Sequence, residues 1–174
     1  DYEEVVSRPR SHFTAYSDCT ESQFADNAVF AEQLIHGRDH WYGSLESTIG
    51  VEGRGNGIAI GDANGDGLED IYFCQPAALP NRLFIRDQDG RFIDRSAEAG
   101  VDWLDSSRGA LFVDLDNDGD LDILLTGRAT PAGAITRIYQ NDYNPATNTG
   151  SFNNTPALTF TGIETGDAEF GDFN

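Results

Sequence analysis

The sequence predicts a mainly β protein made of repeated units of short strands joined by acidic loops. The first observation is a nine-residue pattern, Asp-x-Asp/Asn-x-Asp-Gly-x-x-Asp, which is complete at residues 62–70 and 114–122 and starts again at 172–174, after Gly171. The second is that short apolar runs flank each complete copy. Runs of this length, bounded by Asp, Gly or Pro, are typical of buried strands rather than helices. The runs are Ile58–Ile60, Ile71–Cys74, Ala110–Val113 and Ile123–Thr126.

An N-terminal extension, residues 1–49, precedes the repeats, and one helix is predicted in it at about residues 21–36. Thr20 has the features of an N-cap, and Gln23 three residues later completes a capping box. We expect the apolar face of this helix to pack against the repeat region. The apolar positions at helical spacing are Phe24, Ala28, Ala31, Leu34 and Ile35, and Gly37 would end the helix.

The repeats are predicted at residues 50–101 and 102–163, with the incomplete start of a third at 164–174. The first two align at a constant offset of 52 residues around their acidic loops. A period of about 50–60 residues with four short strands fits the blades of a β-propeller, which typically has about four to eight of them. Two blades and a fragment leave three possibilities open: a piece of a longer propeller, copies that complete each other's sheets, or a small sheet domain capped by the N-terminal segment.

The acidic loops have the composition of a calcium site. Ca²⁺ takes about 6–8 oxygen ligands, and alternate residues Asp114, Asp116 and Asp118 would point inward. Gly119 would permit the sharp turn, because glycine adopts positive φ without steric cost. The carbonyl of Asp120 and the side chain of Asp122 would complete the site. In the first loop the amide of Asn64 replaces one carboxylate.

Two other interpretations of these loops are weaker. An EF-hand requires a Glu at position 12 and flanking helices, whereas position 12 is Phe73 or Leu125, each inside an apolar run. Asp, Asn and Gly also mark ordinary turns. A turn, however, gains nothing from four or five crowded carboxylates, which repel one another unless a cation neutralises them.

Together these features resemble the FG-GAP, or VCBS, repeat, which forms propeller blades in integrin α-chains, secreted bacterial proteins and proteins related to cartilage acidic protein. Residues 81–87 and 89–94 resemble the later strands of such a repeat, and residues 96–101 resemble its inter-repeat connection. The resemblance covers about residues 50–174 and implies calcium ligands in each loop. These are Asp62, Asn64, Asp66, Leu68 (carbonyl) and Asp70; Asp114, Asp116, Asp118, Asp120 (carbonyl) and Asp122; and Asp172 and Asn174 in a partial third site.

Charge and cysteine content limit the functional classes. A net charge of −19 argues against nucleic-acid binding, which requires positive potential. No signal peptide and no apolar run of membrane-spanning length is present. An extracellular or cell-surface location is expected, because calcium there would keep even weak sites filled. Cys19 and Cys74 are the only cysteines, and a disulfide between them and two separate buried thiols are about equally plausible.

The predicted function is that of a secreted calcium-binding repeat protein with an adhesive or scaffold role. Alternatives are a self-assembling subunit of an extracellular filament or surface layer, and a non-catalytic part of a larger secreted enzyme. The chain lacks a Gly-x-Ser-x-Gly elbow, a His-Glu-x-x-His motif and a P-loop, so no catalytic or organic-cofactor site is predicted. The partner, a protein or a glycan, is left unspecified, and a homo-oligomer or filament is possible.

Overall fold

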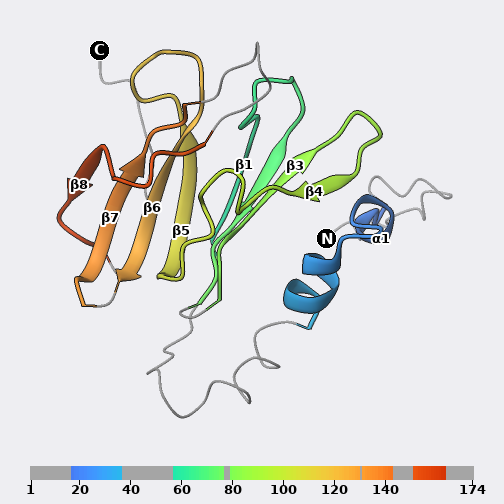
Figure 1. Cartoon of the computed structure of the whole chain (residues 1–174), viewed down its shortest axis with the longest axis horizontal. Coiled ribbons are helices and arrows are strands. Elements are labelled where there is room, and N and C mark those ends of the chain that lie inside the picture. The colour runs from blue at the N-terminus through green and yellow to red at the C-terminus, as the bar shows by residue number, and fades with distance from the viewer. Residues whose placement is uncertain (1–16, 37–56, 77–78, 130, 143–150, 164–174) are drawn as a thin grey trace, which may run out of the picture.

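The computed structural model describes residues 17–36, 57–76, 79–129, 131–142 and 151–163. Two antiparallel sheets lie side by side, and a short helical segment lies beside the first of them (Figure 1). In each sheet the four strands are hydrogen-bonded in chain order. The first sheet contains β1 (Ile58–Gly61), β2 (Asp70–Phe73), β3 (Arg82–Arg86) and β4 (Phe92–Asp94). The second contains β5 (Ser106–Val113), β6 (Asp122–Ala129), β7 (Gly133–Tyr139) and β8 (Leu158–Phe160).

This architecture confirms the predicted fold class: a mainly β protein whose sheets have the form of propeller blades, not closed into a ring. Each acidic loop joins the first two strands of its sheet, as the flanking apolar runs indicated. The strand pairing also agrees with the alignment of the repeats. Ile60 pairs with Ile71 in the first sheet, and Phe112 pairs with Ile123 in the second. The exact ends of the predicted repeats stay a prediction.

The main core lies between the two sheets. Tyr72 of β2 and Phe112 of β5 meet edge to face with their ring centroids 6.5 Å apart. Trp103, from the connection between the sheets, stacks on Tyr139 at 3.9 Å. Burial of such side chains contributes most of the stability of a small domain. The core also includes Ala59, Ala63, Cys74, Leu83, Ala99, Val101, Ile123, Leu125 and Phe152.

Glycines allow the inner strands to approach closely. A Cβ added to Gly57 would stand 2.7 Å from the carbonyl oxygen of Arg108, a distance that real Cβ atoms do not adopt. At the other end of β1, a Cβ on Gly61 would stand 2.9 Å from Cδ1 of Leu121 and 3.2 Å from Cδ2 of Phe112. The absence of side chains at these two positions therefore sets how tightly β1 and β5 pack.

The N-terminal segment differs from the prediction. Instead of one helix over residues 21–36, the structure has α1 (Thr20–Gln23) and the π-helical turn η1 (Phe30–Leu34), separated by a turn in which Asp26 adopts a φ of 64°. The predicted capping box is also wrong, because the N-cap is Cys19, whose side chain makes no capping hydrogen bond. In a straight helix Phe24 and Phe30 would point in different directions. The break lets their rings stack at 4.3 Å.

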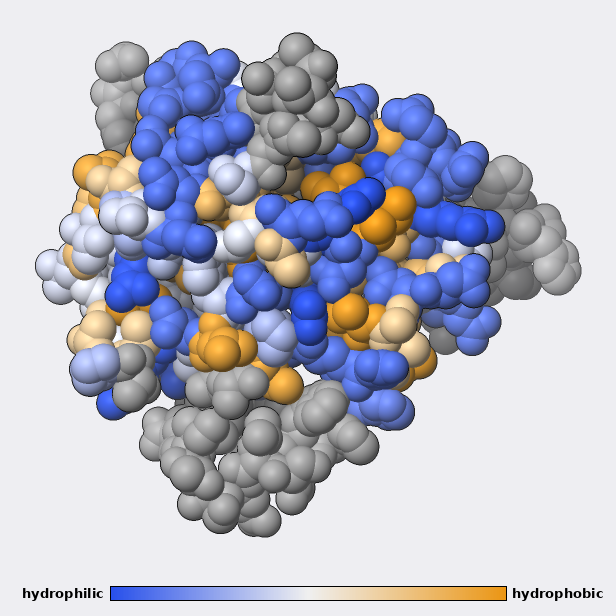
Figure 2. Space-filling model, viewed as in Figure 1, coloured by the Kyte–Doolittle hydropathy of each residue, from blue (hydrophilic) through white to orange (hydrophobic). Residues whose placement is uncertain are grey.

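Several other predictions are settled or lie outside the described residues. Cys19 is exposed and Cys74 is buried, and both are free thiols, so the disulfide does not form. Among the described residues, no helix is long and apolar enough to cross a membrane. The viewed surface is mainly hydrophilic with small hydrophobic patches (Figure 2). The third repeat, with Asp172 and Asn174, lies outside the described residues.

Candidate metal centre

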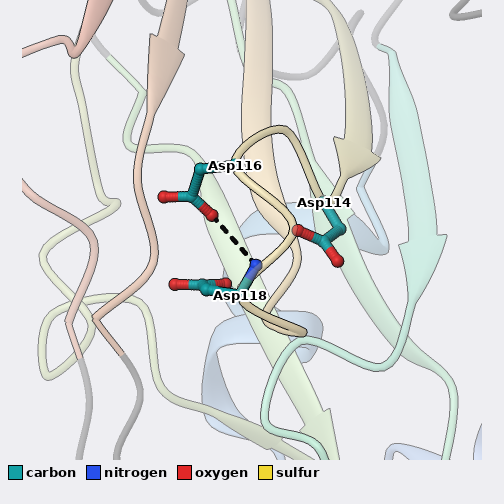
Figure 3. A group of neighbouring side chains, drawn as sticks. All are labelled: Asp114, Asp116 and Asp118. Atoms are coloured by element: carbon teal, nitrogen blue, oxygen red, sulfur yellow. Dashed lines mark hydrogen bonds between the residues drawn. The ribbon is translucent and has the colours of Figure 1, made fainter.

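The second acidic loop, residues 114–122, brings three of its predicted ligands together. Asp114, Asp116 and Asp118 each offer one carboxylate oxygen, and these oxygens lie within 4.8 Å of one another. Figure 3 shows the three side chains on this loop. Oxygen Oδ1 of Asp114 is buried and has no hydrogen-bond partner. A buried acceptor without a partner is costly, so this atom marks a place where a cation would be favourable.

The backbone of the second loop is shaped by residues with positive φ. Gly119 has a φ of 99°, as the sequence led us to expect, and Asn117 has a φ of 60°. Side chains of the loop also accept hydrogen bonds from the backbone two residues further on. The N–H of Asp118 donates to Oδ1 of Asp116 at 3.3 Å (Figure 3), and that of Asp120 donates to Oδ1 of Asp118 at 2.9 Å. These two short turns fix the positions of the Asp116 and Asp118 carboxylates on the loop.

The last aspartate of each loop is buried and holds the loop to its sheet. Asp70 is 0% exposed and Asp122 is 1% exposed. Asp122 accepts N–H groups from Leu115 at 3.3 Å and from Asn141 at 3.0 Å. Asp70 accepts the equivalent N–H groups, from Ala63 at 2.9 Å and Arg86 at 2.8 Å. Both aspartates therefore have a structural role that does not require an ion, in addition to their predicted role as closing ligands.

The first loop, residues 62–70, satisfies its own carboxylates more fully. Asp62 accepts N–H groups from Asp66 at 3.0 Å and from Gly67 at 2.7 Å, one on each oxygen. The amide of Asn64 donates to Oδ2 of Asp66 at 3.0 Å, and the N–H of Leu68 donates to Oδ1 of Asp66 at 2.8 Å. Among the described residues, this loop gathers no group of three acidic side chains like that of the second loop.

Burial and crowding favour the protonated form of several loop carboxyls. Burial, with smaller contributions from Asp66 and Asp62, raises the pKa of Asp70 to about 6. Burial also raises the pKa of Asp122. The pKa of Asp120 is raised by desolvation and then by the charges of Asp118, Asp114 and Asp116. A divalent cation would oppose these shifts, because it stabilises the ionised carboxylates.

Two further residues at the site have no signature in the sequence. Gln140 donates from Nε2 to Oδ2 of Asp116 at 2.7 Å. Asn141, which is 3% exposed, donates from Nδ2 to the carbonyl oxygens of Ala63 at 2.8 Å and Leu121 at 3.1 Å. It therefore links the two loops. Both residues follow β7. They lie 24 and 20 residues from their partners in the second loop, and Asn141 lies 78 residues from Ala63 in the first, so only the tertiary structure brings them to the loops.

The donor set suits a hard cation. Carboxylate, amide and backbone oxygens are the ligands that Ca²⁺ takes, at about 2.3–2.6 Å. Cysteine and histidine, which would favour a softer metal such as Zn²⁺, are absent from both loops. With the unpartnered oxygen of Asp114, the second loop fits a calcium ion that Asp114, Asp116 and Asp118 would hold.

Two stacked meander sheets, each with an acidic loop between its first two strands, define a repeat protein of the propeller-blade class. A comparison with protein families matches residues 62–125 to the FG-GAP-like repeat. This match runs from the first predicted ligand of the first loop to the strand that follows the second. It confirms the resemblance inferred from the sequence: residues 62–125 are similar to the FG-GAP-like repeat.

Curated relatives support the same identification. Cartilage acidic protein 1 of Homo sapiens is 38% identical over 82 residues, which are 47% of this chain and 12% of the relative. The Xenopus tropicalis protein of the same name is 38% identical over 71 residues, 40% of this chain and 11% of the relative. That of Mus musculus is 37% identical over 82 residues, 47% of this chain and 12% of the relative. The chain thus matches only about an eighth of the length of these relatives.

Proposed function

We propose that this chain is a calcium-binding repeat segment of an extracellular protein, with an adhesive or scaffold role and no catalytic step of its own. The single observation that carries the proposal is the second acidic loop. It places three carboxylates within 4.8 Å of one another and leaves Oδ1 of Asp114 buried without a partner. Calcium bound there would neutralise this charge.

The ion would act by fixing the connection between two strands. The second loop joins β5 to β6, and both strands contribute to the core between the sheets through Phe112 and Ile123. Neutralising the loop would therefore stabilise the packing of the whole interface. Asp62, Asn64, Asp66, Asp70 and the carbonyl of Leu68 would hold a second ion in the first loop. Two ions would reduce the formal charge of −19 to about −15, since each Ca²⁺ carries two positive charges.

An extracellular role is supported by the type of site and by the relatives. Loops with partly exposed ligands bind calcium weakly, so they are filled only where the ion is abundant. Extracellular calcium-binding modules have Kd values of about 10⁻⁴–10⁻³ M. The matching relatives carry the name cartilage acidic protein 1, and the net charge of this chain is −19. The adhesive or scaffold role is inferred from this class of repeat.

Thermal unfolding with calcium or with EDTA tests the proposal. Calcium should raise the Tm by several degrees, because a ligand that binds only the folded state stabilises it by RT ln(1 + [L]/Kd). Magnesium at the same concentration should have a smaller effect, since it demands octahedral geometry at about 2.0–2.1 Å. Asp118→Ala should weaken the second site and leave the first unchanged. A melting curve that is insensitive to calcium and chelator would contradict the proposal.

One observation favours self-assembly as a second candidate function. Strand β8 forms the outer edge of the second sheet among the described residues, and its Leu158 and Phe160 are 46% and 51% exposed. Edge strands with exposed apolar side chains are suited to pairing with a strand of another chain. Light scattering with calcium and with EDTA tests this. Growth of assemblies in calcium supports a filament or surface-layer subunit, and a constant monomer mass contradicts it.

A further inference from the structure

The two sheets stack in the same sense, so their equivalent faces point in the same direction. The second sheet turns one face toward the first, and the paired residues Phe112, Ile123 and Tyr139 cross this face from β5 to β7. All three are buried, at 9%, 0% and 2% exposed. The first sheet is what covers them, through Tyr72 and the glycine at position 61.

The equivalent face of the first sheet points away from the second sheet. Ile60, Ile71 and Phe84 cross it in the same register. Along this row the exposure differs sharply: Ile60 on β1 is 64% exposed, whereas Phe84 on β3 is 0% exposed. The outer strands of this face are therefore covered, although no sheet lies against them among the described residues.

The cover is the N-terminal segment, residues 17–36. The ring of Phe24 stacks on Phe92 of β4 at 4.9 Å, meets Phe84 of β3 edge to face at 5.2 Å, and stacks on Phe30 of its own segment at 4.3 Å. Figure 1 shows this segment beside β4, on the side of the first sheet opposite the second sheet. Aromatic rings packed in this way contribute more than their buried area alone.

Specific polar contacts fix the segment in place. Asn27 donates from Nδ2 to the carbonyl oxygen of Phe92 at 3.0 Å. Gln33, which is 8% exposed, donates from Nε2 to the carbonyl oxygen of Pro80 at 2.9 Å. Its Oε1 accepts two hydrogen bonds from the guanidinium of Arg82, at 2.8 and 2.6 Å. This fork-like pairing with a buried amide indicates a built contact rather than loose apolar packing.

We propose that residues 17–36 are a cap that covers, on the first sheet, the outer part of the face whose equivalent on the second sheet is covered by the first sheet. The cap covers the outer strands β3 and β4 and leaves Ile58 and Ile60 of β1 exposed. The same face fits a four-stranded blade, so the cap and a blade exclude each other there. Removing the cap therefore creates a docking face for a blade of another copy.

The cap depends on the sheet for its own structure. Its helical elements are only four and five residues long, and isolated helices shorter than about 12–15 residues are marginal in water. Contacts with the sheet must therefore supply the stability of the cap. A single truncation in the aromatic contact should release the whole segment while the two sheets stay folded.

Hydrogen exchange and a fluorescent label on Cys19 test the cap. Cys19 is exposed, whereas burial raises the pKa of the Cys74 thiol to about 12, so the label goes to one site. Phe24→Ala should lower the anisotropy of the label and speed amide exchange in residues 17–36 at least tenfold. Exchange at Ile123–Leu125 should stay unchanged, which shows that the sheets remain folded.

Matched variants make the outcome decisive. Ile35→Ala changes a side chain of the same segment that is 63% exposed and should behave as wild type. Gln33→Ala should release the cap as Phe24→Ala does. Protection of residues 17–36 that is the same in Phe24→Ala as in Ile35→Ala would overturn the cap. So would wild-type protection that disappears on dilution, because a second copy would then hold the segment.

Light scattering tests the docking half of the proposal. Phe24→Ala should self-associate with increasing concentration, and adding Ile60→Glu, which places a charge on the inner part of the same face, should restore the monomer. A released cap in a chain that stays monomeric at every concentration would overturn the docking face and leave the cap assignment in place. Measured in EDTA, these readouts are independent of the proposed calcium site, and the Ile60→Glu variant separates association through this face from association through β8.

Discussion

The two acidic loops share one pattern but differ in how they satisfy their carboxylates. In the first loop both oxygens of Asp62 accept backbone N–H groups, from Asp66 and Gly67. In the second loop the equivalent Asp114 keeps a buried oxygen without a partner, beside two more carboxylates. The comparison shows that one pattern can produce a loop that closes on its own hydrogen bonds and a loop that leaves a buried carboxylate oxygen without a partner, where a cation would be favourable.

The loops are alike at their last residue. Asp70 and Asp122 are both buried and both accept two backbone N–H groups, one from the loop and one from the last residue of β3 or from Asn141 after β7. The loops differ before this last residue: Asn64 in the first loop stands opposite Asp116 in the second, and Leu68 stands opposite Asp120. Variants at these positions separate the structural role of the loops from ion binding.

Truncating the closing aspartates should have the largest effect. Asp70→Ala and Asp122→Ala each leave two N–H groups without an acceptor, and each buried unsatisfied group costs about 1–3 kcal/mol. Both variants should lose about 2–5 kcal/mol of unfolding free energy, measured by urea denaturation in EDTA. Asp89→Ala, at an exposed turn, serves as the control and should change stability by less than about 0.5 kcal/mol. A small loss in either variant would show that these hydrogen bonds do not hold the loop.

Removing one ligand from each loop should separate their responses to calcium. At a calcium concentration a hundredfold above Kd, a site adds about 2.7 kcal/mol to the stability. Asp118→Asn, in the second loop, should abolish most of the calcium-dependent rise in Tm. Asp66→Asn, in the first loop, should abolish only a smaller part of that rise. In EDTA, Asp118→Asn should melt no lower than wild type, because it removes one of three crowded charges. Equal losses in the two variants would remove the distinction between the loops.

Converting the first loop toward the second should sharpen the comparison further. Asn64→Asp adds a carboxylate and removes the hydrogen bond from Asn64 to Asp66. Stability in EDTA should fall by about 0.5–1.5 kcal/mol, the net value of one hydrogen bond, and calcium affinity at the first loop should rise several-fold. Calorimetric titration of an Asp118→Asn background, in which the second loop is weakened, measures the first loop directly. Unchanged affinity would mean that position 3 does not contact the ion.

Truncating Gln140 should have the smallest effect. Gln140→Ala removes the hydrogen bond that the Gln140 side chain, just after β7, donates to Asp116. The variant should lose about 0.5–1.5 kcal/mol of unfolding free energy in EDTA. The cost should shrink in saturating calcium, because the ion then neutralises Asp116. Gln88→Ala, at an exposed turn, is the matched control. A cost that is the same with and without calcium would place Gln140 outside the influence of the site.

Much of the fold could be predicted because its signals are local. The apolar runs beside the loops became β1, β2, β5 and β6, and the glycine of each loop adopts the positive φ that its position requires. The loop composition also identified the three carboxylates that come together. In each of these cases the residue type and its immediate neighbours are sufficient to determine the conformation.

What the sequence could not predict depends on contacts between distant segments. Helical periodicity suggested a continuous helix, but contacts of Phe24 with Phe84 and Phe92 accompany a break in it, so tertiary packing overrides a weak local preference. Gln140 and Asn141 reach the loops only through the register of β6 and β7. The different hydrogen bonding of Asp62 and Asp114 is likewise invisible in a pattern that treats the two positions as equal.

Calorimetric titration of calcium into Asp114→Asn and Asp62→Asn tests the central claim most directly. Wild type should bind calcium most tightly at the second loop, Asp114→Asn should lose this tighter site, and Asp62→Asn should keep it. Loss of the tighter site in Asp62→Asn with its retention in Asp114→Asn would contradict the account, and so would the absence of calcium binding in the wild-type chain.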